Sequence, residues 1–175
     1  MTFENNTAGT VTRAVSEAAK HIITIINNYT KKDTTVTIED VNIDVSGGEY
    51  GTGKAAMSVE GVGDTTLKLE GDNTLRGGHH CAGLEKDDEY STGKLTITAE
   101  DTSASLKAYG GDNSAGIGGG SYDSTSKLEI ANGKIYAEGG FRGAGIGGGS
   151  IGGNGEVTIS GGEVTAYASG GGAGI

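Results

Sequence analysis

The sequence predicts an all-β protein: a right-handed, single-stranded parallel β-helix of about five coils, each of roughly 29 residues. The first observation is a repeat, because Ala-Gly-Ile occurs at 115–117, 144–146 and 173–175, each copy 29 residues after the last. The second is that short segments of alternating apolar and polar residues accompany each copy, as in strands with one buried face. The third is the 35 glycines and the lack of proline, which suit glycine corners between hydrogen-bonded strands.

Composition limits the classes of function. A length of 175 residues suits one domain, and 34% hydrophobic residues suit a narrow core stacked along an axis. The net charge is −10 and the 13 basic residues are scattered, so we expect no nucleic-acid partner. No apolar run is long enough to insert into a membrane. Cys81 is the only cysteine, which excludes an intrachain disulfide.

Residues 1–35 differ from the repeats and are predicted to cap the solenoid or to lead into it. Apolar residues fall on one stripe of a helix, which predicts a short N-terminal capping helix over the first coil; they are Ala14, Val15, Ala18, Ala19 and Ile22. The alternative is that the segment simply enters a first strand at 21–26. The opening Met-Thr-Phe-Glu-Asn-Asn does not have the pattern of a signal peptide.

The β-helix itself is expected over 36–175, and its first strand per coil is the most regular. Leu95-Thr96-Ile97, 128–130 and 157–159 share one pattern, and 67–69 and 36–38 fit the same place upstream. Because side chains alternate across a strand, the apolar residues should form inward ladders. The expected ladders are Leu95/Leu128/Val157 and Ile97/Ile130/Ile159.

The second strand per coil is 106–109, 135–138 or 164–167, with Gly-Gly following closely. Upstream, 43–48 matches it and 75–78 is a shortened version. Small inward residues, in the ladder Ala108/Ala137/Ala166, leave room for larger side chains opposite.

The third strand is the Ala-Gly-Ile element, preceded by 81–84 and more loosely by 55–57. It predicts the ladder Ile117/Ile146/Ile175. A β-sandwich would not keep one period for such small-residue segments, and right-handed winding follows from the rule for parallel crossovers. Because the sequence stops within a repeat at Ile175, we expect a segment of a longer protein. Its uncapped last coil could associate end to end with another copy.

Two motifs are explained by the repeat. Gly143, Gly145 and Gly148 satisfy the G-x-G-x-x-G dinucleotide pattern, but similar glycines recur one coil earlier and no helix is expected to follow. His79-His80-Cys81 could suggest zinc, which normally needs four ligands at recognisable spacing. The place of Cys81 is taken by Ser114, Gly143 and Gly172 in other coils, so we interpret this segment as a corner turn.

No metal or cofactor is predicted. Calcium needs six to eight oxygen ligands, which the acidic insertion 85–89 could supply only in part, and the calcium-binding nonapeptide repeat is absent from the sequence. A solvated loop is the favoured interpretation of the insertion. The outward acids Glu129, Glu138 and Glu156 form no pair suited to glycoside hydrolysis, so no catalytic residue is assigned.

The candidate site is an outward strip on the second strands. Alternation turns Tyr109 and Tyr167 outward in the same register, two coils and roughly 9–10 Å apart. Aromatic faces beside polar groups suit sugar rings, and the predicted ligand-binding residues are Tyr109, Tyr136, Tyr167, Lys107 and Glu138, with Thr165 beside them. The alternative is that Tyr and Thr are simply favourable strand residues on a solvated sheet.

The segments 158–166 (Thr-Ile-Ser-Gly-Gly-Glu-Val-Thr-Ala), 170–175 and 67–75 (Leu-Lys-Leu-Glu-Gly-Asp-Asn-Thr-Leu) carry a family resemblance. Over about 36–175 the chain resembles a glycine-rich parallel β-helix repeat of Gram-positive, often gut, bacterial surface proteins. These are usually labelled adhesins or carbohydrate-binding proteins, often with Ig-like modules and wall anchors. The resemblance implies an extracellular or cell-surface location and supplies no catalytic motif.

Together these observations predict a non-catalytic extracellular adhesion module of a larger bacterial protein. Its expected partner is a polysaccharide or a host-surface glycan on one β-helix face. The alternatives are a polysaccharide lyase or glycoside hydrolase on the same scaffold, and a purely structural stalk. Ice binding is disfavoured because Glu129 interrupts the ladder of Thr96 and Thr158.

Overall fold

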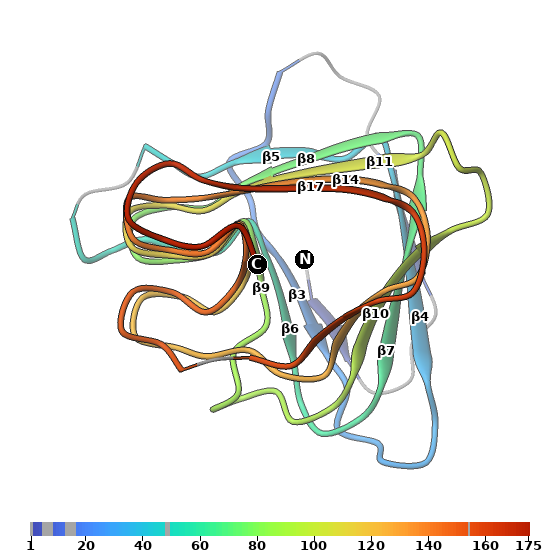
Figure 1. Ribbon diagram of the computed structural model, residues 1–175. Helices are drawn as coiled ribbons and strands as arrows, with labels where there is room; N and C mark the ends of the chain where they lie inside the picture. Colours follow the sequence, from blue (N-terminus) through green and yellow to red (C-terminus); the bar gives the residue numbers. More distant parts are fainter. Residues whose placement is uncertain (1, 5–8, 13–16, 48–49, 154) are drawn as a thin grey trace.

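The computed structural model describes residues 2–4, 9–12, 17–47, 50–153 and 155–175. Figure 1 looks along the axis of the molecule, around which successive coils lie one over another. In this view the chain passes counterclockwise through β7 (Thr65–Glu70), β8 (Asp72–Arg76) and β9 (Leu84–Glu85) while the C-terminal coil lies in front, so the winding is right-handed. The predicted all-β solenoid of about five turns is confirmed.

Three parallel sheets form the three sides of the solenoid. Sheet I contains β2 (Gly9–Thr12), β4 (Thr34–Glu39), β7 (Thr65–Glu70), β10 (Leu95–Ala99), β13 (Leu128–Ile130) and β16 (Val157–Ile159). Sheet II contains β5 (Asn42–Asp44), β8 (Asp72–Arg76), β11 (Ser105–Tyr109), β14 (Lys134–Gly139) and β17 (Glu163–Ala168). Sheet III contains β1 (Thr2–Glu4), β3 (Ile23–Ile26), β6 (Met57–Glu60), β9 (Leu84–Glu85), β12 (Ile117–Gly118) and β15 (Ile146–Gly147).

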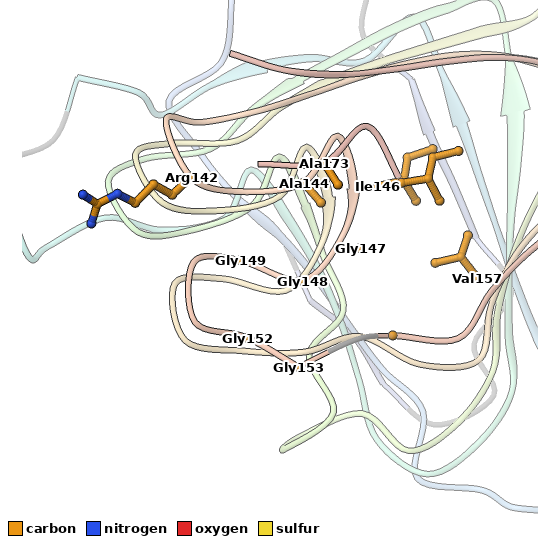
Figure 2. Close-up of a pocket in the computed structure, with 12 residues that line it drawn as sticks. Arg142, Ala144, Ile146, Gly147, Gly148, Gly149, Gly152, Gly153, Val157 and Ala173 are labelled. Carbon is orange, nitrogen blue, oxygen red and sulfur yellow. The ribbon is translucent and has the colours of Figure 1, made fainter. Parts of the chain in front are cut away.

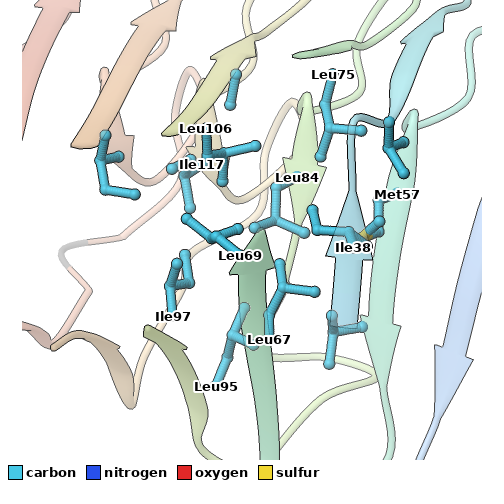
Figure 3. Packing of buried hydrophobic residues seen from close by; sticks show 14 of the residues in the cluster. Ile38, Met57, Leu67, Leu69, Leu75, Leu84, Leu95, Ile97, Leu106 and Ile117 are labelled. Atoms are coloured by element: carbon cyan, nitrogen blue, oxygen red, sulfur yellow. The ribbon is translucent and has the colours of Figure 1, made fainter. Parts of the chain in front are cut away.

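The core is a column of stacked aliphatic side chains inside these sheets. Figure 3 shows Leu67, Leu95 and Ile97 from sheet I converging with side chains from the other two sheets. The repeat predicted much of the register correctly: Leu95 pairs with Leu128, and Leu128 pairs with Val157. The ladder of Ala108, Ala137 and Ala166 in sheet II and the pair of Ile117 and Ile146 in sheet III are also observed.

The register between β7 and β10 differs from the sequence alignment by two residues. Leu67 pairs with Ile97 rather than with Leu95, whose partner is Thr65. A shift of two residues keeps every side chain on its own face of the sheet. The alternating pattern therefore could not distinguish the two registers.

The predicted N-terminal capping helix is wrong: the structure contains no helix over the residues it describes. The Ala19 N–H donates to Asn42 O at 2.8 Å, and Asp44 N–H donates to Ala19 O at 2.9 Å, so this residue forms a bridge with Ile43 instead. Ala18 and Ile22 flank that extended segment, whereas Ala14 and Val15 lie outside the described residues. A helix would satisfy these backbone groups internally and leave the edge of β5 without partners.

Residues before 35 thus take part in the same sheets. β1 pairs with β3 in sheet III, and β2 pairs with β4 in sheet I. The alternative prediction, that the segment enters a strand, agrees with β3. Within the described part of the chain, no helix is long and apolar enough to cross a membrane.

The final coil presents apolar side chains at its open side. Ile146 N–H donates to Gly174 O at 2.9 Å, so the last residues continue sheet III over β15. Ile175 is nevertheless 61% exposed, and Ile159 is 44% exposed. Figure 2 shows Ile146, Val157 and Ala173 around the hollow of about 380 Å³ at this end.

Candidate functional site: the outer face of sheet II

The structure brings the five predicted site residues together on the outer face of sheet II. Lys107 stands in register with Tyr136, and Tyr109 with Glu138. β17 continues both rows, because Tyr136 pairs with Thr165 and Glu138 with Tyr167. These rows run along the solenoid axis with about 4.8 Å between successive strands.

Arg76 is a residue of this face that sequence reasoning missed. It precedes Tyr109 in its row, and its guanidinium carbon lies 3.7 Å from the centre of the Tyr109 ring. A cation over an aromatic face is stabilised by the ring quadrupole. The sequence carries part of the signal, since 75–78 is a shortened version of the second strand and contains Arg76. The register that places Arg76 beside Tyr109 comes from the structure.

The three tyrosines are held differently. The rings of Tyr109 and Tyr136 are tilted at 49° with centres 5.7 Å apart. The Tyr136 hydroxyl donates to Glu138 Oε2 at 2.8 Å, and this hydrogen bond raises the pKa of Tyr136. Tyr109 and Tyr136 are half-buried, whereas Tyr167 is 55% exposed. Tyr167 is thus the most accessible aromatic side chain of the strip.

Two shallow hollows flank the tyrosines. The first, which we call the Lys107 hollow, has a volume of about 330 Å³ and lies near the starts of the strands; its polar lining is Asp72, Ser103, Ser105, Lys107, Lys134, Tyr136, Glu163 and Thr165. The second, the Arg76 hollow, has a volume of about 360 Å³; its lining includes Ser46, Arg76, His79, Tyr109 and Asp112. A ligand crossing the sheet between the hollows would pass over Tyr109 and Tyr136.

The acids of the Lys107 hollow already have partners within the protein. Ser105 Oγ donates to Asp72 Oδ1 at 2.6 Å. Lys134 Nζ lies 3.8 Å from Glu163 Oε2. Among the residues that the structure describes, by contrast, no carboxylate lies within ion-pair distance of Lys107 Nζ.

Asp44, which lies in register beside Arg76 in sheet II, also has hydrogen-bond partners. Asp44 Oδ1 accepts hydrogen bonds from Ser46 Oγ at 2.6 Å and from Ser46 N–H at 3.0 Å. These bonds, helped by Lys20 and Arg76, lower the pKa of Asp44 despite its partial burial. Asp44 therefore stays ionised at the N-terminal end of this row.

The segment His79-His80-Cys81 forms a turn at the edge of the Arg76 hollow. His80 has a φ of 64°, and Cys81 N–H donates to Gly78 O at 3.1 Å. The Tyr50 ring packs edge-on against both histidines, at centre distances of 4.9 and 5.0 Å. Over the described ranges no group of three or more His, Cys, Asp or Glu side chains could hold a metal ion.

The insertion after β9 is partly buried, which corrects its interpretation as a solvated loop. Lys86 is 1% exposed, and its Nζ donates to Ser91 O at 2.9 Å. The physical reason is its place two residues after inward-facing Leu84, which points its side chain to the interior. Glu89 and Tyr90 in the same insertion are exposed.

A corner of half-buried acids lies on this side of sheet III, away from the tyrosine strip. Burial raises the pKa of Glu85 to about 7, although Ala82 N–H donates to Glu85 Oε2 at 3.0 Å and opposes the shift. Burial likewise raises the pKa of Asp123 and, with Glu85 and Asp123 nearby, that of Cys81 to about 12. Burial disfavours the charged form of each of these groups.

Comparisons with family models, curated proteins and solved structures gave no match for this chain.

Proposed function

We propose that the protein is a non-catalytic extracellular adhesion module of a larger bacterial surface protein, and that it binds polysaccharide on the outer face of sheet II. The observation that carries the proposal is the gathering of Tyr109, Tyr136 and Tyr167 on one face between two hollows. The resemblance of the repeat to bacterial surface proteins supports the extracellular location.

The chemistry of the face suits a sugar chain. The C–H face of a pyranose ring packs against an aromatic ring, while its hydroxyls need polar partners at the edge. Tyr167 offers the most accessible ring, and Thr165, Lys107 and Glu138 supply polar groups around it. Arg76 covers one face of Tyr109, so we expect stacking chiefly on Tyr167 and Tyr136.

The carboxylates of the Lys107 hollow support binding over hydrolysis. Asp72 and Glu163 are separated by three strand spacings, through Ser105 and Lys134. Their backbone positions are therefore about 14 Å apart, at 4.8 Å per strand. Glycoside hydrolases hold their two carboxyl groups about 5 to 9.5 Å apart.

The proposal is tested by glycan-array binding followed by titration calorimetry on the best ligand. We expect the double variant Tyr136→Ala, Tyr167→Ala to lose at least tenfold in affinity. Tyr29→Ala is the matched control, because Tyr29 is 53% exposed in the segment after β3 and lies outside sheet II. Circular dichroism would verify that each variant is folded.

Each alternative gives a different result in the same experiment. A purely structural stalk would bind no glycan on the array, which would overturn the proposal. A lyase or hydrolase would shorten the bound oligosaccharide during incubation, detectable by mass spectrometry. Equal loss of affinity in the Tyr29 control would also contradict a site on sheet II.

A further inference from the structure

We propose that the sugar chain bound on sheet II is uncharged, with hydroxyl or acetamido groups on its rings but no carboxylate, sulfate or free amine. This inference rests on the proposed function and names the class of its ligand. It follows from the way in which opposite charges accompany one another over the outer face of sheet II.

The strands of sheet II carry nearly equal numbers of acids and bases. Over β5, β8, β11, β14 and β17 the four acids and three bases are Asp44, Asp72, Glu138 and Glu163, and Arg76, Lys107 and Lys134. The whole chain, by contrast, has 23 acids and 13 bases. The face that carries the tyrosines is therefore close to neutral although the chain is strongly acidic.

Two of the three bases stand directly beside an acid. Lys134 Nζ lies 3.8 Å from Glu163 Oε2. Arg76 is in register with Asp44 and helps to lower the pKa of that carboxyl. Neither cation is left over for an anionic ligand.

Lys107, the third base, lies between two acids at diagonal positions. Its neighbours in register are Thr74 on β8 and Tyr136 on β14. Asp72 and Glu138 each lie two residues away from these neighbours along the same strands. Such a diagonal corresponds to about 7–8 Å on one face of a sheet, which is within the Debye length of about 8 Å at physiological ionic strength. The two acids therefore offset much of the positive potential of Lys107.

A sugar ring stacked on Tyr136 would have both signs of charge at its edge. Lys107 stands in register beside Tyr136, and Glu138 accepts the tyrosine hydroxyl at 2.8 Å. An ammonium group can only donate hydrogen bonds and a carboxylate can only accept them. A sugar hydroxyl does both, so an uncharged ring can satisfy Lys107 with one hydroxyl and Glu138 with another.

A charged sugar at the same place would gain on one side and lose on the other. A carboxylate or sulfate would be attracted by Lys107 and repelled by Glu138, and an amine would meet the reverse. Like charges that face one another across an interface reduce affinity, and the ligand charge would also have to leave water without a full counter-charge. An uncharged chain avoids both costs.

The test uses titration calorimetry with two pairs of oligosaccharides that differ in charge. The first pair is an oligogalacturonate and its fully methyl-esterified form, and the second is a chitosan oligosaccharide and its N-acetylated form. Within a pair that binds, we expect the uncharged member to bind at least about threefold more tightly at about 0.15 M salt. Its affinity should change by less than about twofold when the salt is raised to about 0.5 M, because screening acts on charged groups.

Substitutions of the two flanking charges should act on opposite probes. Glu138→Gln should reduce the disadvantage of the oligogalacturonate, because it removes the repelling carboxylate while its amide oxygen can still accept the Tyr136 hydroxyl. Lys107→Gln should reduce the disadvantage of the chitosan oligosaccharide. Glu156→Gln and Lys31→Gln make the same charge changes at exposed residues outside sheet II, so they are the matched controls and should leave both ratios of affinity unchanged.

Equal or tighter binding of a charged member, or a steep loss of affinity with salt for an uncharged one, would overturn the inference. If the tyrosine double variant loses binding of that charged member, the proposed function stands alone. If neither pair binds, the glycan array decides: binding confined to uncharged glycans supports the inference, and binding of charged ones overturns it. If no glycan binds at all, both proposals fall.

Discussion

The guanidinium of Arg76 covers one face of the Tyr109 ring on the next coil, with 3.7 Å between the guanidinium carbon and the ring centre. This contact continues through Tyr136 to Glu138, by a ring contact and then a hydrogen bond. Side chains from β8, β11 and β14 are thereby connected along the outside of the solenoid. The rings of Tyr109 and Tyr136 are consequently held in place by neighbouring side chains before any ligand arrives.

Replacing Arg76 with Gln should weaken the fold slightly. Loss of the cation–π contact is expected to lower the free energy of unfolding by about 0.5–1 kcal/mol, measured by urea denaturation. Lys107→Gln is the control, because it removes a cation from the same face and Lys107 forms no ion pair or cation–π contact with the residues that the structure describes. Its effect should stay within about 0.5 kcal/mol. Equal effects of the two substitutions would contradict a stabilising role for Arg76.

Stability should fall as the pH rises from 4.5 to 7, because of Glu85. Its pKa is about 7 in the folded protein, against 4.5 for an ordinary Glu. Between these values the folded state binds a proton that the unfolded state has lost, so raising the pH favours unfolding. The difference corresponds to a loss on the order of 3 kcal/mol, complete above pH 7.

Glu85→Gln should flatten this part of the curve of unfolding free energy against pH, measured by urea denaturation at several pH values. Glu156→Gln, at an exposed residue, should leave the curve unchanged. The check is the difference between the two proteins, the unfolding free energy of the wild type minus that of Glu85→Gln at each pH. If this difference rises between pH 5 and 7, Glu85 is not protonated in the folded protein.

Cys81 should react slowly with thiol reagents while the protein is folded. Burial and the nearby Glu85 and Asp123 raise its pKa to about 12, and the thiolate is the reactive form. At pH 8 only about one thiol in ten thousand would be ionised. The measurement uses a disulfide reagent whose leaving group absorbs visible light once a thiol displaces it. The reagent should detect one thiol per molecule, slowly in buffer and rapidly in concentrated urea. Similar rates in both conditions would refute the shift.

Two glycines in the corners that follow β14 and β17 should respond differently to alanine. A Cβ on Gly140 would lie 2.0 Å from Gly111 O, whereas one on Gly171 meets nothing within 4 Å. Gly140→Ala should lower the melting temperature by more than about 10 °C, since it forces apart the backbones of neighbouring coils. Gly171→Ala should be neutral or slightly stabilising. Thermal unfolding measures both, and similar melting temperatures would contradict the close stacking at Gly140.

The fold was largely predictable because the chain repeats itself. Equivalent residues such as Leu128 and Val157 could be aligned by the repeat alone, and stacking then dictated their pairing. Where the repeat weakens, the prediction failed in two ways. Between β7 and β10, alternation permitted a shift of two residues. Before β3, a helical stripe that included Ala19 was outweighed by the backbone partners that β5 offers.

The sequence predicted which face of the solenoid carries the candidate site, but not how the side chains of that site contact one another. Alternation placed Tyr109, Tyr136 and Tyr167 outward correctly. It could not show that Arg76 covers Tyr109, because that contact depends on side-chain conformations. Nor could it show the burial of Glu85, which depends on the loops that pack over its corner.

The direction of the hydrogen bonds has a mechanical consequence. In all three sheets they run between coils, parallel to the axis, so a force pulling the two ends apart loads them one coil at a time instead of all together. Each coil that peels away would release a loop of roughly 29 residues, about 100 Å of extended chain at 3.3–3.6 Å per residue. Under tension the molecule would therefore lengthen in a series of steps, one for each coil, and would absorb the load gradually.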